Sequence, residues 1–226
     1  GYYAMIGDTA RRIEIMYQVL KHLEDDDDRL SHFQTLSNLL VEEAGPTEAA
    51  FHALAQAFLL DSNDVSRLEQ LTEWSAALDL DQALRETLES ALLTDVEPEW
   101  RTEYIKRLAR LCQRTPDGAE RGLQLWQEVL LDEEYNEEAL SALDVMYTEA
   151  QDWERLLDVL GRLVDVIPQD QATNIRIRLG RLLEVVGSDE VSAIEQHQLV
   201  LAEEPTNQTA LAELERLMAE PAYQEQ

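Results

Sequence analysis

Residues 100–147 read WRTEYIKRLARLCQRTPDGAERGLQLWQEVLLDEEYNEEALSALDVMY, and residues 171–218, which lie 71 positions further along, read QATNIRIRLGRLLEVVGSDEVSAIEQHQLVLAEEPTNQTALAELERLM. The two stretches align without a gap. Apolar residues coincide along the alignment, for example Leu108 with Leu179 and Val129 with Val200. A fixed period of this kind is typical of stacked repeats, in which each unit packs only on its neighbours. It predicts an array of supersecondary units and not one globular core.

The 71-residue unit divides into two helical hairpins of about 35 residues each. Six leucines recur at steps of 35, 37, 35, 36 and 35 residues, and a second large apolar residue follows each of them three positions later. Residues spaced i, i+3 share one face of a helix, so each leucine opens an apolar stripe. These six ladder leucines are Leu36, Leu71, Leu108, Leu143, Leu179 and Leu214. We call a helix that carries a ladder leucine an A helix and the helix that follows it a B helix.

Apolar spacing is helical along nearly the whole chain, and no segment alternates like a strand. Breaks at Gly45-Pro46, Pro116-Asp117-Gly118, Pro168 and Gly187-Ser188 carry ordinary turn residues. Together these signals predict twelve helices, over residues 8–25, 29–44, 47–60, 64–77, 80–94, 98–114, 118–132, 136–150, 152–167, 170–187, 189–203 and 207–219.

Composition narrows the class of partner. The 226-residue chain carries 47 acidic and 18 basic residues, a formal net charge of -29. Nucleic acid and anionic membrane surfaces both require a basic footprint, so we expect neither as a partner. No apolar run is long enough to span a bilayer. The single cysteine, Cys112, excludes an intrachain disulfide and is compatible with the reducing cytoplasm.

The repeats resemble a known family. The period, the run Leu179-Gly180 followed by Leu183, and Pro205 closing a B helix are similar to tetratricopeptide repeats. Ser37, Ala109 and Gly180 supply the small residue that this family has after the ladder leucine, whereas Thr72, Asp144 and Glu215 depart from it. The resemblance implies an all-α fold, a right-handed superhelical α-solenoid of about six antiparallel helix pairs. Another α-solenoid, such as a HEAT-like array, is the alternative.

We expect one continuous solenoid with four segments. Residues 1–28 form the last helix of a truncated upstream repeat, residues 29–97 and 98–169 form repeats, and residues 170–226 form a repeat with a capping helix and a short tail. The chain begins at Gly1 without a methionine and within a repeat, so we expect it to be a fragment of a larger protein.

No motif of catalysis is found: there is no nucleophile elbow, phosphate loop, His-Glu-x-x-His or Cys-x-x-Cys pattern. The sequence therefore predicts no enzyme and no cofactor. The acidic run Asp25–Asp28 lacks the staggered spacing of a calcium loop and is interpreted as a solvated loop between helices. His197 aligns with Trp126 and is interpreted as a structurally satisfied packing residue.

Basic residues concentrate on two A helices, which hold eight of the 18. Arg107 aligns with Arg178 and Arg110 with Arg181, and Arg110 points away from Leu108 on an ideal helix. In tetratricopeptide arrays the A helices line the concave groove. The resemblance therefore implies a groove-lining, peptide-binding set of Arg107, Arg110, Asn174, Arg178, Arg181, Arg216, Glu69, Glu73 and Asn38.

Two interpretations of this set stay open. The arginines could hold an acidic side chain or a C-terminal carboxylate of a peptide, since guanidinium groups bind carboxylates in a bidentate manner. Alternatively, they pair with Glu and Asp of the next helices and only stabilise the stack. The predicted function is a non-catalytic scaffold that binds a peptide or partner protein. A structural spacer or self-assembly element is the alternative.

Overall fold

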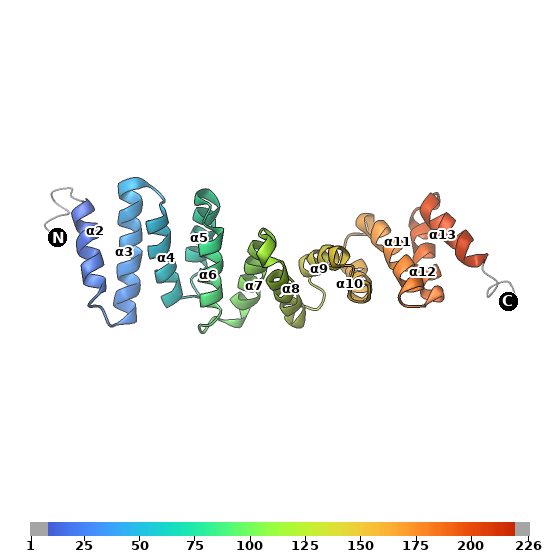
Figure 1. Ribbon diagram of the computed structural model, residues 1–226, viewed down its shortest axis with the longest axis horizontal. Coiled ribbons are helices and arrows are strands. Elements are labelled where there is room, and N and C mark those ends of the chain that lie inside the picture. The colour runs from blue at the N-terminus through green and yellow to red at the C-terminus, as the bar shows by residue number, and fades with distance from the viewer. Residues whose placement is uncertain (1–8, 220–226) are drawn as a thin grey trace. The chain divides into compact units, whose positions relative to one another are not determined.

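The computed structural model describes residues 9–219, apart from the side chains of Pro116 and Asp170. These residues form twelve α-helices and one short 3-10 helix, and none of them is in a strand (Figure 1). The predicted all-helical fold and the number of helices are confirmed for this part of the chain. Asp8, the first residue of the predicted 8–25 helix, lies outside the described residues.

The chain divides into two compact units, residues 1–122 and 123–226. The first unit contains α2 (Thr9–Leu20), α3 (Asp26–Ala44), α4 (Glu48–Leu60), α5 (Val65–Leu78), α6 (Asp81–Ala91), α7 (Pro98–Gln113) and η1 (Pro116–Gly118). Helix α8 (Ala119–Asp132) runs across the boundary between the units. The second unit contains α9 (Glu137–Ala150), α10 (Trp153–Val166), α11 (Gln169–Val185), α12 (Glu190–Glu203) and α13 (Gln208–Met218).

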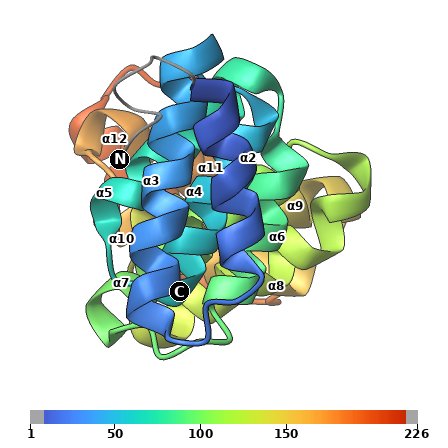
Figure 2. The same cartoon turned by 90° about the vertical axis from the view of Figure 1, so that its left-hand side faces the viewer.

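Within each unit, helices that follow one another in sequence pack side by side. In the first unit α2 lies against α3 and α3 against α4 (Figures 1 and 2). In the second unit α9 packs on α10, α11 on α12, and α12 on α13. The short connections between them are those of antiparallel helical hairpins.

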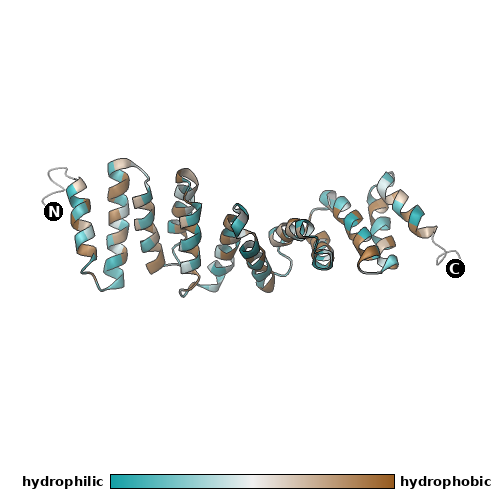
Figure 3. Cartoon of the chain, in the orientation of Figure 1, coloured by the Kyte–Doolittle hydropathy of each residue, from teal (hydrophilic) through white to brown (hydrophobic). Residues whose placement is uncertain are grey.

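The ladder leucines are part of the hydrophobic core. Leu36, Leu71, Leu108, Leu143 and Leu179 are buried, and Leu214 on α13 is half-buried. They mark α3, α5, α7, α9, α11 and α13 as A helices and the intervening helices as B helices. The B helix α4 is apolar over much of its length, as its colour in Figure 3 shows, and it is packed between α3 and α5. The repeat ladder predicted from the sequence is confirmed.

Side-chain caps explain where many of the helices begin. The side chains of Asp25, Thr47, Asp64, Asn136, Asp152, Asp189 and Asn207 each accept a hydrogen bond from the backbone N–H three residues later. Such caps satisfy amide groups that have no partner inside the helix.

One of these caps corrects the interpretation of the acidic run. Asp25–Asp28 is not an inter-helix loop: Asp25 caps α3 and residues 26–28 form its first turn. Carboxylates are stabilised there by the partial positive charge of the helix N-terminus. An acidic run in a sequence is therefore compatible with the first turn of a helix as well as with a loop.

The residue after the ladder leucine contacts the following B helix in some repeats and is exposed in others. Ser37 is buried and donates its hydroxyl to the Ala50 carbonyl oxygen at 3.0 Å. Gly180 packs so close to His197 that an added Cβ would lie 2.7 Å from Nε2. Asp144, which departs from the small-residue pattern, is nonetheless buried because Arg178 neutralises it. Thr72 and Glu215 are exposed at the same position of their repeats.

The four predicted repeat segments, 1–28, 29–97, 98–169 and 170–226, stay a prediction. Residues 1–8 of the first segment and 220–226 of the last lie outside the described residues.

Candidate functional site

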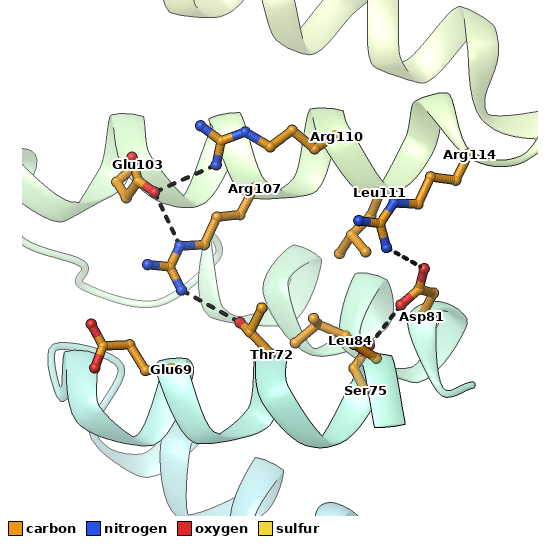
Figure 4. A pocket seen from close by; sticks show the side chains of 11 residues that line it. Glu69, Thr72, Ser75, Asp81, Leu84, Glu103, Arg107, Arg110, Leu111 and Arg114 are labelled. Atoms are coloured by element: carbon orange, nitrogen blue, oxygen red, sulfur yellow. Dashed lines mark hydrogen bonds and ion pairs between the residues drawn. The ribbon is translucent and has the colours of Figure 1, made fainter. Parts of the chain in front are cut away.

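The first unit contains a pocket of about 330 Å³ between two successive A helices. Helices α5 and α7 form its opposing walls, and α6 contributes at its base (Figure 4). We call it the first pocket; its lining residues are Glu69, Thr72, Ser75, Ala76, Asp81, Leu84, Glu103, Arg107, Arg110, Leu111 and Arg114.

Glu103 organises the α7 wall of the first pocket. It lies one turn before Arg107 on the same helix, and Arg107 Nε donates to its Oε1 at 3.1 Å. Arg110 approaches the same oxygen at 3.6 Å. Arg107 also reaches across to α5, where its Nη1 donates to Thr72 Oγ1 at 3.4 Å (Figure 4). The two arginines therefore share one carboxylate of their own helix.

Asp81 holds the third arginine of this wall. Arg114 Nη1 lies 2.8 Å from Asp81 Oδ2, and the Ser75 hydroxyl donates to Asp81 Oδ1 at 2.8 Å. Burial acts to raise the pKa of Asp81. The hydrogen bonds from Arg114 and Ser75 together lower it by more, so this pKa lies below its ordinary value. Asp81 is thus fixed as an anion.

The α5 wall differs from the α7 wall in that its carboxylates are not engaged in ion pairs within residues 9–219. Glu69 and Glu73 are both exposed, one turn apart, and within residues 9–219 their carboxylates make no hydrogen bond or ion pair. Glu69 lies at the edge of the pocket across from Arg107 (Figure 4). Between the walls, the buried side chains of Leu84 and Leu111 form an apolar floor.

The second unit contains a related pocket of about 200 Å³. We call it the second pocket; it is lined by Thr148 of α9, Trp153 and Leu156 of α10, and Arg178, Arg181 and Leu182 of α11. Its apolar side chains include Trp153, an indole that is 42% exposed.

The two pockets are formed by the same positions of the repeat. Counted from the ladder leucine, Ala76, Asp81 and Leu84 correspond to Thr148, Trp153 and Leu156. Likewise Arg107, Arg110 and Leu111 correspond to Arg178, Arg181 and Leu182. All six residues of the second pocket therefore have an equivalent in the first.

Ion pairs link the A helices of the second unit. Arg178 Nη1 donates to Asp144 Oδ2 at 2.8 Å, and this hydrogen bond raises the pKa of the guanidinium. Arg181 Nε donates to Glu213 Oε1 at 2.7 Å. Arg216 pairs with Glu184, which lowers the pKa of that carboxyl group. Pairing with neighbouring helices is therefore present for these arginines, as one of the two sequence-based interpretations expects.

The nine residues of the predicted binding set fall in different places. Glu69, Arg107 and Arg110 meet in the first pocket, with Glu73 one turn along the same wall. Arg178 and Arg181 meet in the second pocket. Asn38 on α3, Asn174 on α11 and Arg216 on α13 line neither pocket.

Sequence reasoning missed the contribution of the B helices. Asp81 and Trp153 begin α6 and α10, ten positions after their ladder leucines. Their equivalence was visible in the repeat alignment, but their approach to the next A helix depends on how the helices pack.

His197 is buried, as is Trp126 at the equivalent position. The interpretation of His197 as a packing residue is confirmed. It is not fully satisfied, however, because its Nδ1 is buried without a hydrogen-bond partner. Burial lowers the pKa of its imidazole, so the neutral form is favoured.

Residues 9–219 contain neither a candidate metal-ion site nor a helix able to span a membrane. No group of three or more His, Cys, Asp or Glu side chains in that range is arranged to hold a metal ion. Nor does any helix there combine the length and apolar character needed to cross a bilayer.

Comparisons with known proteins concern the fold. No protein-family model matches the chain, and no curated protein matches it. The chain is similar in structure to YrrB, which is reported as a TPR protein with an unusual peptide-binding site. The two are 13% identical, the match covers 90% of this chain and 99% of YrrB, and the TM-score is 0.48. PilF of Pseudomonas aeruginosa is 13% identical over 95% of this chain and 92% of its own, with a TM-score of 0.47. A thermophilic TPR protein of Thermus thermophilus, TTC0263, is 14% identical over 84% of this chain and 98% of its own, with a TM-score of 0.38.

The tetratricopeptide-like fold follows from the chain itself, from its helix pairs, its period and its buried ladder.

Proposed function

We propose that the chain is a non-catalytic scaffold that binds segments of partner proteins in its two repeat-equivalent pockets. The observation that carries the proposal is the recurrence of one pocket, at the same six repeat positions, in both units. Arrays of helical repeats commonly present extended surfaces for binding proteins. The combination of an apolar floor with a few charged groups suits a peptide, whose side chains fill the pocket while its polar groups fix its orientation.

Arg107, Arg110, Arg178 and Arg181 are the contacts we assign to the ligand on the α7 and α11 walls. In the second pocket, Arg181 is 53% exposed beside Trp153 and Leu182, which supports a ligand that carries a carboxylate next to an apolar side chain. Such a carboxylate would exchange with Glu213 for the guanidinium, so the net gain would be small. Asn38, Asn174 and Arg216 are assigned flanking contacts for a longer ligand.

A structural spacer or self-assembly element is the competing function. The ion pairs of Arg178, Arg181 and Arg216 favour it, because they occupy the arginines with the chain's own carboxylates. Under this alternative the pockets are gaps between repeats with no ligand, and filling them leaves the behaviour of the protein unchanged.

Filling each pocket with an indole separates these functions. Ala76 lines the first pocket and Thr148 the second, and both are exposed on their helices, so Ala76→Trp and Thr148→Trp obstruct the pockets without entering the core. Ala77→Trp is the matched control, since Ala77 is exposed on the same helix but does not line the pocket. Helix content by circular dichroism verifies that each variant is folded.

The measurement is selection of a random peptide library on the immobilised chain. We expect the wild type and Ala77→Trp to enrich the same peptides, and the double variant Ala76→Trp/Thr148→Trp to bind them at least about tenfold more weakly, a loss of about 1.4 kcal/mol. If the wild type enriches no peptide, or if the double variant binds the selected peptides equally well, the pockets are not the binding sites and the spacer function is favoured.

A further inference from the structure

The two pockets differ in the wall contributed by the preceding A helix. Two positions before and two positions after the ladder leucine, the first unit has Glu69 and Glu73, whereas the second unit has Ser141 and Val145. All four residues are exposed. On the opposite wall, Arg107 and Arg110 recur as Arg178 and Arg181. The first pocket therefore has Glu69 at its edge and Glu73 one turn along the same helix, whereas the second unit has no carboxylate at either position.

Ion pairs within the first pocket distinguish its arginines from Glu69 and Glu73. Glu103 faces the guanidinium groups of Arg107 and Arg110, and Asp81 faces Arg114. Each of these three arginines therefore already contacts a carboxylate of the chain, and Lys106 also approaches Glu103, at 3.6 Å. Among the residues that the structure describes, Glu69 and Glu73 form no such ion pair.

We propose that the first pocket takes a basic side chain, a Lys or Arg of an extended segment of a partner protein, against Glu69 and Glu73. This inference rests on the proposed function and names the chemistry of its ligand. The aliphatic stem of the basic side chain lies on Leu84, Leu111 and Ala76, while its charged end reaches the α5 wall. Val145 and Ser141 give the second pocket no equivalent attraction.

The negative charge of the whole chain also favours a basic ligand. A net charge of -29 attracts basic segments and repels acidic ones over distances beyond contact. This long-range attraction is not specific to any site, and salt screens it. Specificity for the first pocket comes from the two carboxylates, each of which contributes about a two- to fivefold change in Kd as an exposed ion pair.

The test uses the full chain and three fluorescein-labelled synthetic peptides. One alternates Lys with Leu, the second carries Glu in place of Lys, and the third carries Ser; binding is followed by fluorescence anisotropy. Glu69→Gln/Glu73→Gln removes the carboxylate at the edge of the pocket and the one that lies one turn along α5. Glu137→Gln/Glu149→Gln removes the same charge from exposed positions of α9 and serves as the matched control.

We expect the Lys peptide to bind most tightly to the wild type. Its Kd increases about fivefold or more in Glu69→Gln/Glu73→Gln and less than about twofold in the control. Ala76→Trp weakens the same peptide, and Thr148→Trp does not. Because all substituted residues are exposed, unchanged helix content verifies that a loss of binding is not a loss of fold.

Several outcomes would overturn the inference. Equal losses in the two double Gln variants would mean that the Lys peptide responds only to net charge. Tighter binding of the Glu or Ser peptide, still abolished by Ala76→Trp, would contradict the basic ligand while leaving the proposed function standing. Failure of all three peptides, together with a peptide library that enriches nothing, would contradict both.

Discussion

Gly180 and Gly161 lie on neighbouring helices but have opposite surroundings. A Cβ on Gly180 would lie 2.7 Å from His197 Nε2 and 3.3 Å from the Ala193 carbonyl oxygen, whereas a Cβ on Gly161 would meet no atom within 4 Å. The absence of a side chain at Gly180 is what allows α11 to approach α12. At Gly161 the same absence only costs conformational entropy in α10.

Alanine substitution at the two glycines is therefore expected to have opposite effects on stability. Gly180→Ala should lower the free energy of unfolding by about 1 kcal/mol or more, because overpacking exceeds the gain in helix propensity. Gly161→Ala should raise it by about 0.5–1 kcal/mol. Urea denaturation of both variants beside the wild type is the measurement. Equal stabilities would mean that α11 and α12 are not packed as closely as described.

His197 of α12 is buried against Gly180 of α11, and it faces charged groups of α11 and α13. Burial lowers its pKa; Glu213 and Glu184 oppose that shift, and Arg181 and Arg216 reinforce it. In the unfolded chain the imidazole protonates as the pH falls through its ordinary value of 6.5. In the folded chain it does so only at lower pH, so the unfolded state binds more protons and stability is lost towards acid.

We expect the free energy of unfolding to fall between pH 7.5 and pH 5.5, and the fall to be smaller in His197→Gln, which cannot be protonated. These pH values are about one unit on either side of the ordinary pKa of histidine. The lowered pKa values of Glu184 and Glu213 act below this window, since their stabilising effect is lost only under about pH 4.5. His22, His32 and His52 are common to both proteins, so the difference between the two slopes reports on His197. Parallel slopes would exclude a suppressed protonation at this site.

At the scale of the helix, the ladder was predictable because its geometry is local. Leu108 and Leu111 share a face on any α-helix, and a repeat of that pair places the same face towards the same neighbour. Five of the six ladder leucines are buried as this pattern predicts. Helix ends were less predictable: Asp25–Asp28 suits both a loop and a capped first turn, and only the hydrogen bond to the Asp28 amide distinguishes them.

The candidate site was predictable on its A helices and not on its B helices. The alignment of Arg107 with Arg178 follows from the sequence, whereas the pairing of Arg178 with Asp144, 34 residues earlier, depends on the packing of α9 against its neighbours and on long side-chain rotamers. For the same reason Asp81 and Trp153 could not be assigned to a pocket. Periodicity predicts which face a residue occupies; it does not predict which charged group across an interface will meet it.

At the scale of the whole chain, charge balance predicts a dependence of stability on salt. Even if each of the 18 basic residues paired with one of the 47 acidic residues, 29 carboxylates would lack a cation (47 − 18 = 29). Their mutual repulsion opposes the compact state, and it is screened once the Debye length falls to about 10 Å or less. The exposed ion pairs weaken in salt as well, but each contributes only about 0–1 kcal/mol.

We therefore expect the thermal midpoint to rise when NaCl is increased from about 0.05 M to about 0.5 M, a range over which the Debye length falls well below 10 Å. Each kcal/mol of repulsion relieved should raise the midpoint by about 2–4 °C for a chain of this size. NaCl is preferred to a sulfate salt, which would strengthen apolar burial independently of charge. A variant with four exposed carboxylates outside the first turn of any helix changed to amides, Glu69→Gln, Glu73→Gln, Glu149→Gln and Glu215→Gln, should start from a higher midpoint and respond less to salt. A midpoint that falls with salt would instead show that the ion pairs of the A helices outweigh the repulsion among the unpaired carboxylates.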